Sequence, residues 1–226
     1  MDSPLPYWQT NIPVSQRPQT CPPYLTALNA KDIAILSTPD NQYHILTWPE
    51  VRALIAANRL DAFQRIPSQL RRYLHYNWTL KRDYGSVMNF VLSQRLHWSE
   101  PVRAAGSRPF ESEEDVRVLC NDWPYGIDGR IVHLVVWTKF VLEDDEATGD
   151  LTGEARGLIE GYVGRTFGER VGRENVIWFK NWKILKSVDK LEHFHVMLFQ
   201  PNPEFVKEVT HGDVPLSQKV DTQVVP

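Results

Sequence analysis

The chain has 226 residues, of which 42% are hydrophobic and 23% are charged, and its formal net charge is −3. This composition is typical of a folded globular protein and excludes the disordered and fibrous classes. The longest apolar run, Ile131 to Trp137 with His133 inside it, is far shorter than the roughly 20 residues that span a bilayer. The amino end has no charged-then-apolar signal pattern. We therefore expect a cytoplasmic protein that does not enter a membrane.

Cysteine spacing and short motifs exclude several common kinds of site. Cys21 and Cys120 lie far apart, and neither belongs to a Cys-x-x-Cys or Cys/His spacing, so we expect reduced thiols, with neither a disulfide framework nor a structural zinc site. The sequence has no GxxxxGK[ST], strand-linked GxGxxG or GxSxG motif, which removes the usual support for nucleotide hydrolysis, dinucleotide redox chemistry and α/β-hydrolase chemistry. We expect no cofactor.

The first half of the chain predicts an arm followed by helices. Residues 1–24 are rich in proline and carry Tyr7 and Trp8, which favours an extended arm that packs through its aromatic side chains. Thr47 and Glu50 have the capping-box spacing, with proline in the first turn, and therefore predict a helix that starts near Thr47.

A second helix is predicted from Pro67. Its apolar residues Leu70, Tyr73, Leu74 and Trp78 fall on one face. Gly85 is expected to interrupt the helix. The helical spacing of apolar residues resumes after Gly85 and extends to about Leu96.

The second half of the chain changes to the alternating pattern of strands. Ile131–Leu142, Val176–Trp182 and Phe194–Phe199 are the candidate strands, and Thr152 caps a helix that runs to about residue 168. This order predicts an α+β fold in which helices pack on a small, mostly antiparallel sheet. We expect one domain over residues 25–200 and an irregular, partly mobile tail over 201–226.

Charge is distributed unevenly along the chain. Residues 59–108 hold nine Lys/Arg and three acids, whereas residues 111–160 hold four Lys/Arg and thirteen acids. Guanidinium groups bind phosphate and aromatic faces stack on bases, so a basic and aromatic segment suits nucleic acid. The candidate phosphate-binding residues are Arg65, Arg71, Arg72, Lys81 and Arg82. The alternative is a solvated helix face over an aromatic core.

Strand parity places three histidines on one face if the strands of residues 131–142 and 192–199 pair. His193 and His195 alternate with apolar residues, as His133 does in the earlier strand. Such a face suits a general base that titrates near neutral pH. The alternatives are a divalent-metal site and a half-buried, hydrogen-bonded layer covered by the helix at 152–168.

Several longer motifs resemble the fungal N-acetylglucosamine-induced protein family. The segments that carry the resemblance are Leu36–Asp40, Leu46–Glu50, Leu70–Leu74, Tyr84–Val91, Asn121–Gly126, Ile131–Lys139, Phe179–Trp182 and Glu192–His195. They occur in one order and cover roughly residues 7–200. Fungal arginine-containing cyclodipeptide synthases, which take aminoacyl-tRNAs and join arginine to a second amino acid as a diketopiperazine, are similar to this family.

The resemblance implies a cyclodipeptide synthase whose partners are arginyl-tRNA and a second aminoacyl-tRNA. We assign candidate catalytic roles to Glu192, Asp189, His195, His133 and His193. The candidate substrate-binding residues are Asp122, Trp137, Lys139, Trp178 and Lys180, with the carboxylate of Asp122 available to hold a guanidinium. The alternatives are a non-enzymatic or regulatory protein of N-acetylglucosamine metabolism and a metal-dependent enzyme that uses the three histidines.

One motif of the synthases is imperfect in this chain. The synthases resemble one another in an Asp-Asp-x-x-Glu motif, but here Asp144-Asp145 is followed by Thr148 in the glutamate position. The second candidate copy, Asp189 to Glu192, has Val188 where the first aspartate belongs. This departure puts synthase activity of this family member in question.

Overall fold

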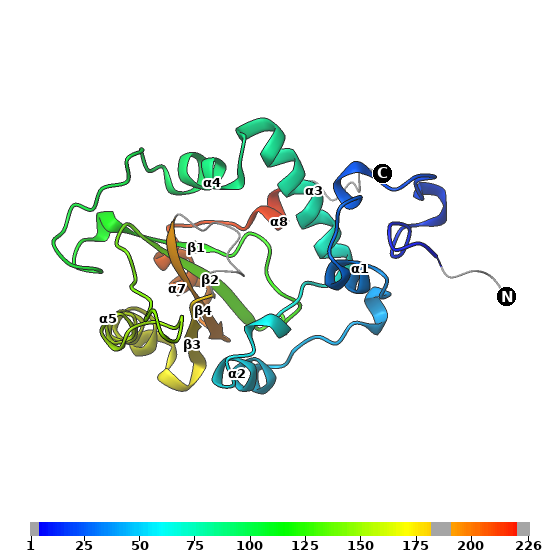
Figure 1. The fold of residues 1–226 in the computed structure, drawn as a ribbon. Helices are drawn as coiled ribbons and strands as arrows, with labels where there is room; N and C mark the ends of the chain where they lie inside the picture. Colours follow the sequence, from blue (N-terminus) through cyan, green and yellow to red (C-terminus); the bar gives the residue numbers. More distant parts are fainter. Residues whose placement is uncertain (1–4, 182–190, 221–226) are drawn as a thin grey trace.

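The computed structural model describes residues 5–181 and 191–220. Its centre is a four-stranded antiparallel sheet in the order β1-β2-β4-β3 (Figure 1). The strands are β1 (Val116–Cys120), β2 (Ile131–Thr138), β3 (Val176–Phe179) and β4 (Glu192–Phe199). Because β2 and β4 each have a neighbour on both sides, their side chains are almost all buried and the two strands form the middle of the core.

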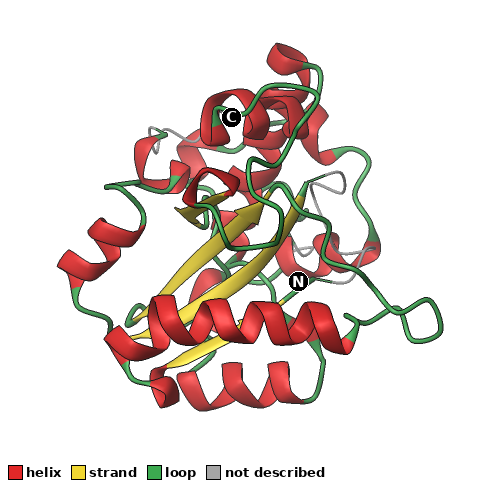
Figure 2. Ribbon diagram, turned by 90° about the vertical axis from the view of Figure 1, so that its left-hand side faces the viewer, coloured by secondary structure: helices red, strands yellow, loops and turns green. Residues whose placement is uncertain are grey.

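Helices pack on both sides of this sheet (Figure 2), which confirms the α+β fold and the single domain. The α-helices are α1 (Ala30–Leu36), α2 (Trp48–Ala56), α3 (Pro67–Tyr84), α4 (Val87–Phe90), α5 (Gly153–Val163), α6 (Glu169–Val171), α7 (Pro203–Val209) and α8 (Leu216–Lys219). Wider π-helical turns extend α4 over Val91–Leu96 and α5 over Gly164–Gly168.

The sequence signals at helix ends act as expected. The backbone N–H of Thr47 donates to the Glu50 carboxylate at 2.8 Å, and α2 begins at the next residue. Gly85 ends α3 with a φ of 76°, a left-handed conformation that glycine adopts without a steric penalty. Thr152 accepts a hydrogen bond from the backbone of Ala155 and starts α5.

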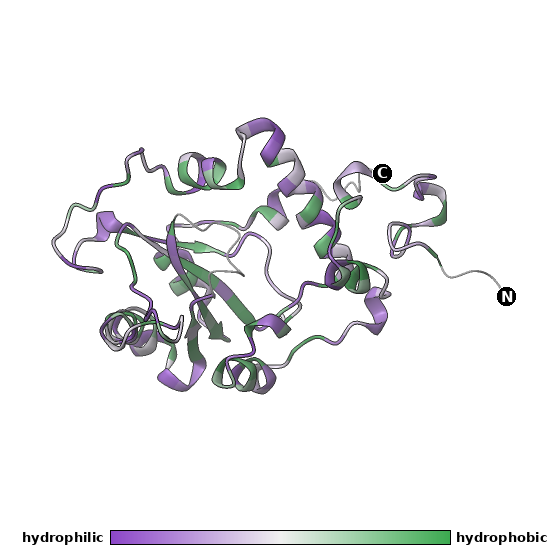
Figure 3. Ribbon diagram, in the orientation of Figure 1, coloured by the Kyte–Doolittle hydropathy of each residue, from purple (hydrophilic) through white to green (hydrophobic). Residues whose placement is uncertain are grey.

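The two faces of the sheet contact different helices. Apolar side chains on the face of Leu134 and Phe194 pack against α5 and α7, and both residues are fully buried. The face of Val135 and Trp137 packs instead against α3, α4 and the π-helical turn. β2 is coloured as hydrophobic along most of its length in Figure 3, whereas the carboxyl-terminal end of α3 is hydrophilic.

Two strand ends and the carboxyl-terminal tail differ from the sequence expectation, and β1 was not expected. The strand expected over Ile131–Leu142 ends at Thr138, because Lys139 continues into a loop where it contacts Asp115. The strand expected over Val176–Trp182 ends at Phe179, and Trp182 lies outside the described residues. The tail expected to be irregular forms α7 and α8, because Phe205 is buried in the core and anchors the first of these helices.

The proline-rich amino-terminal segment follows a series of turns and short 3-10 helices, Val14–Gln16 and Pro23–Leu25, rather than a continuous extended path. Tyr7 and Trp8 pack on the cluster formed by α1, α3 and Leu25. No helix among residues 5–181 and 191–220 is long and apolar enough to cross a bilayer.

Candidate functional site

A cavity of about 160 Å³ lies between the histidine face of the sheet and the helices above it. The sheet contributes Val135, Trp137, His193 and His195, and α3 contributes Tyr73, Tyr76, Asn77 and Leu80. The segment after β1 completes one wall with Asn121, Asp122, Trp123 and Tyr125. Aromatic and polar groups therefore converge on one concave space, which is the usual composition of a small-molecule site.

The pairing of β2 with β4 confirms that three histidines share a sheet face. In this antiparallel register Val135 lies opposite His195, and Trp137 lies opposite His193. His133, His193 and His195 are all buried, with exposed fractions of 4–6%. The helix at 152–168, expected to cover them in one alternative, packs on the opposite face.

Two of the histidines form a hydrogen-bonded chain. Nε2 of His195 lies 3.0 Å from the amide nitrogen of Asn181, and Nδ1 of His195 lies 3.0 Å from Nε2 of His133. An amide nitrogen can only donate, so Nε2 of His195 accepts and Nδ1 of a neutral His195 carries the proton. This proton is donated to His133, whose Nε2 also lies 3.1 Å from the amide nitrogen of Asn121. Both ring nitrogens of His195 are therefore used inside the protein.

Burial keeps these two imidazoles neutral. Burial, with a smaller contribution from the positive charge of Arg65, lowers the pKa of His133 to about 3. Burial also lowers the pKa of His195 well below its usual value, with additional contributions from His133, His193 and Arg65. The expectation of a base that titrates near neutral pH is therefore wrong for His133 and His195, because the folded protein cannot hydrate either cation.

His193 differs from the other two because Nδ1 of its ring is hydrogen-bonded to a backbone carbonyl. Its Nδ1 lies 2.9 Å from the carbonyl oxygen of Leu191, and a carbonyl can only accept, so Nδ1 carries the proton. Nε2 therefore holds the lone pair, and the ring lines the cavity beside Trp137, with centroids 4.5 Å apart. This is the tautomer that a proton acceptor at the cavity requires.

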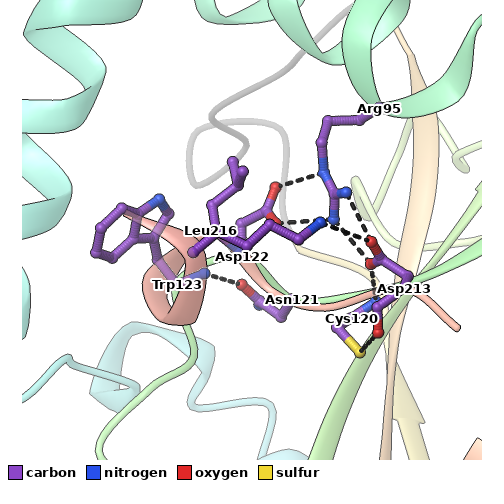
Figure 4. Close-up of polar contacts among 8 residues, drawn as sticks. Arg95, Cys120, Asn121, Asp122, Trp123, Asp213 and Leu216 are labelled. Carbon is purple, nitrogen blue, oxygen red and sulfur yellow. Dashed lines mark hydrogen bonds and ion pairs between the residues drawn. The ribbon is translucent and has the colours of Figure 1, made fainter. Parts of the chain in front are cut away.

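A buried arginine, Arg95, also lines the cavity (Figure 4). The Arg95 guanidinium donates to both carboxylate oxygens of Asp122 and of Asp213, at 2.7–3.0 Å, and its side chain is 8% exposed. Asp213 also accepts from the backbone of Cys120, and Asp122 accepts from that of Leu216. This network fastens the carboxyl-terminal segment to the cavity rim.

The engagement of Asp122 corrects one predicted role. We expected its carboxylate to receive a substrate guanidinium, but this chain's own Arg95 occupies both oxygens. Burial raises the pKa of Asp122, and the nearby Arg95 opposes that change. Asp122 shapes the cavity wall, and it offers no unoccupied fork to a second guanidinium.

The remaining predicted substrate and catalytic residues fall into separate regions. Trp137 lines the cavity, whereas Lys139 pairs with Asp115 at 3.2 Å. Trp178 packs in the core on the α5 side. Lys180 forms ion pairs with Asp144 and Glu192. Glu192 lies on the same face of β4 as Phe194, which is the face opposite the histidines.

The structure consequently does not bring Glu192 and His195 together. Their side chains leave opposite faces of β4, so a joint role in one reaction is not available to them. The predicted catalytic residue Asp189 lies outside the described residues.

The five predicted phosphate-binding residues also lie in different environments. Arg71 is 4% exposed and donates to the backbone carbonyls of Tyr7 and Thr10, so its phosphate-binding role is wrong. Arg72 donates to the carbonyls of Ser217 and Val220 and holds the carboxyl-terminal segment. Lys81 and Arg82 are exposed at the end of α3, and Arg65 lines the cavity.

Sequence reasoning missed Arg95, Asp213, Asn121 and Asn181. The two asparagines fall inside motifs already quoted for the family resemblance, and their positions beside a strand could have marked them. Asp213 carries no comparable signal, because it lies in polar sequence 118 positions from Arg95.

The three histidines do not form a metal site as arranged. Nε2 of His133 and Nδ1 of His195 face one another in a hydrogen bond instead of facing a common point. Across residues 5–181 and 191–220, no group of three or more His, Cys, Asp or Glu side chains has the geometry to hold a metal ion.

The buried histidines predict acid sensitivity. The folded-state pKa of His133 is about 3 and the ordinary value is 6.5, so the unfolded chain takes up a proton first as the pH falls. Stability is therefore retained above about pH 6.5 and lost toward pH 3, by about 2 kcal/mol between pH 7 and pH 5 for this residue. His133→Asn should reduce that loss in urea unfolding. Asn121→Ala should lower stability at every pH and keep the parent's slope; an unchanged slope in His133→Asn would contradict the assignment.

The Arg95 network predicts a large effect from one neutral substitution. Asp213→Asn leaves the buried guanidinium with a single carboxylate, and we expect a loss of about 3 kcal/mol in the free energy of unfolding. Glu208→Gln is the control, because Glu208 pairs with Arg170 on the surface, where the two side chains are 63% and 49% exposed. That change should leave the free energy of unfolding almost unchanged, because solvent screens an exposed ion pair. Equal effects would show that the Arg95 network does not stabilise the fold.

Comparisons with known proteins agree with the resemblance. The chain is 27% identical over 185 residues to N-acetylglucosamine-induced protein 1 of Candida albicans, covering 74% of this chain and 73% of the relative. It is 28% identical over 184 residues to uncharacterized protein YPL067C of Saccharomyces cerevisiae, covering 75% and 91%. The solved structure "Crystal Structure of HTC1" matches with a TM-score of 0.61 and 27% identity, over 76% of this chain and 99% of that one. The model of the family described as "Protein of unknown function (DUF3605)" matches residues 47–199, and the chain belongs to this family.

Proposed function

We propose that the cavity is the active site of an aminoacyl-tRNA-dependent cyclodipeptide synthase that joins arginine to a second amino acid. One observation carries this proposal: motif segments far apart in the sequence, through which the chain resembles its family, line the same cavity. Leu70–Leu74, Tyr84–Val91, Asn121–Gly126, Ile131–Lys139 and Glu192–His195 each contribute at least one lining residue.

The reaction needs little from the protein beyond positioning and proton transfer. The α-amine of one aminoacyl-tRNA attacks the ester carbonyl of the other, the acyl–oxygen bond of the attacked ester breaks, and the tRNA of that ester leaves with the proton on its terminal ribose hydroxyl. The free amine of the dipeptidyl ester then attacks its own ester, closes the ring and releases the second tRNA. Both esters are already activated, so the absence of a phosphate-binding nucleotide loop is consistent with this chemistry.

His193 is the best-placed proton acceptor. The hydrogen bond to the carbonyl oxygen of Leu191 places the proton of a neutral His193 on Nδ1, and the ring lines the cavity. The rings of Trp137 and His195 contact that of His193 and hold it at the cavity. This role replaces the one expected for His195, because burial lowers the pKa of His195 well below its usual value.

The cavity offers aromatic faces to an amino-acid side chain. Trp137, Trp123 and Tyr76 line it, and indole and phenol faces attract a guanidinium as well as apolar groups. Asp122 is occupied by Arg95, so recognition of arginine falls to these faces and to neutral acceptors.

A path for tRNA runs along α3. Tyr76 and Leu80 of this helix line the cavity, and Lys81 and Arg82 are exposed at its carboxyl-terminal end. Trp78 is 41% exposed beside them, with the Arg82 guanidinium 5.6 Å from its ring centroid. Cations next to exposed rings are the combination that contacts phosphates and single-stranded bases.

A non-catalytic protein that binds a small polar molecule is the second candidate. The hydrogen-bonded chain through His133, His195 and Asn181 favours it, because a buried network of neutral groups positions a ligand without reacting with it. The two candidates differ in whether a product forms.

The catalytic assignment predicts loss of product in a single variant. Extracts of a host that expresses the chain should contain arginine-containing diketopiperazines by mass spectrometry, and His193→Gln should reduce them about 100-fold or more. His44→Gln is the control, because His44 pairs with Glu50 on the surface. A fully active His193→Gln would contradict the role of His193, and absence of any diketopiperazine from the parent would favour the binding protein.

The tRNA path predicts a charge-dependent interaction. Reversing Lys81 and Arg82 to glutamate should weaken tRNA binding and reduce the slope of log K against log salt by roughly one unit per lost contact. Reversing Arg173 and Lys207, which are exposed on other elements, should have a smaller effect. Equal losses in the two double variants would assign the binding to net charge alone.

A further inference from the structure

Two arginines line the cavity, and their surroundings differ. Arg95 makes four hydrogen bonds to two carboxylates. Arg65 makes one, from Nε to the backbone carbonyl of Trp123 at 2.9 Å. Within the described part of the chain, the two terminal amino groups of Arg65 have no hydrogen-bond or ion-pair partner.

The orientation of Arg65 is nevertheless fixed. Its guanidinium carbon lies 3.8 Å from the ring centroid of Tyr73 and 5.5 Å from that of Tyr125. The bond to Trp123 sets the rotation of the plane within this stack. A planar guanidinium held in this way has lost most of its side-chain freedom before any ligand arrives, so binding an oxyanion costs little further entropy.

The ionised groups that line the cavity carry a net positive charge, which suits an oxyanion ligand. Its ionised lining groups are Arg65, Arg95 and Asp122, and Asp122 is engaged by Arg95. The positive charge of Arg65 extends to His133 and His195, whose pKa values it lowers. A part-buried cation ordinarily has a carboxylate partner, and here the described residues supply none.

We propose that Arg65 is a phosphate-binding residue of this cavity and that its ligand is the phosphate of a nucleotide. The two terminal amino groups form a fork that matches two oxygens of one phosphate. The rings of Tyr73, Tyr76 and Trp123 cluster beside this fork and provide a surface on which a base stacks. The inference rests on the proposed function, in which the nucleotide is the terminal adenosine of the acceptor end; an amino acid held as an ester presents no carboxylate.

Titrations followed by NMR of the arginine Nε–H groups test this inference. The signal of Arg65 is assigned by its absence in Arg65→Lys. Adenosine 5′-monophosphate and inorganic phosphate should each shift it saturably, and acetate should bind more weakly than either. Arg65→Gln should weaken binding of adenosine 5′-monophosphate about tenfold or more, because a charge-assisted hydrogen-bond pair is lost. Arg65→Lys should weaken it less, because the charge remains.

Arg130→Gln is the matched control, because Arg130 is exposed, stacks on Phe199 and pairs with Asp128 away from the cavity. Its affinity for adenosine 5′-monophosphate should equal that of the parent. Unchanged affinity in Arg65→Gln, no shift with either phosphate probe, or tighter binding of acetate than of phosphate would each overturn the inference. The assay measures binding only, so phosphate binding at Arg65 without diketopiperazine production would leave this inference standing and refute the synthase.

Discussion

The antiparallel pairing of β2 with β4 is the constraint on which the site depends. These strands are separated by about 60 positions, yet their register sets Val135 opposite His195 and brings Nδ1 of His195 to 3.0 Å from Nε2 of His133. A shift of β4 by one residue would turn His193 and His195 to the opposite face, against α5 and its apolar core. The cavity therefore has its polar floor only in this register, and the core on the other face fixes that register.

Burying these polar groups costs free energy, and the hydrogen bonds among them offset that cost. A neutral imidazole in the core loses its hydration, and the amides of Asn121 and Asn181 replace that hydration with hydrogen bonds. The same burial that makes the pair structural makes it a poor base. In the proposed function the proton acceptor is therefore His193, whose Nδ1 is hydrogen-bonded to the carbonyl oxygen of Leu191 and whose ring lines the cavity.

Local sequence signals predicted most of the fold. The capping box at Thr47, the stripe from Pro67 and the alternation from Ile131 have physical causes within a few residues of chain, and the structure contains all three elements. β1 was missed because the strand has only five residues, and the alternating pattern within it is limited to Val116 and Val118. The helices after Pro201 were missed because their sequence is polar, and the burial of Phe205 that holds them is a tertiary effect.

The alternation of side chains along the strands predicted only one part of the candidate site. Parity correctly grouped the three histidines, but it could not show that Arg95 takes the carboxylate of Asp122, since that contact joins a helical turn to a loop. Nor could charge counting show that Arg71 holds the amino-terminal backbone while Arg65 faces the cavity. Partners distant in sequence decide what a charged side chain does, and a single sequence does not contain that information.

The proposed function requires that an aminoacyl group binds in this cavity. The most direct test is photo-crosslinking with 3′-amino-3′-deoxyadenosine that carries a photoreactive phenylalanine through a stable amide, followed by mass spectrometry of the peptides. Our account predicts labelling of the segments around Tyr76, Trp123 and Trp137, and loss of that labelling when aminoacyl-tRNA competes. Labelling confined to residues outside the cavity, or labelling that aminoacyl-tRNA does not reduce, would contradict it.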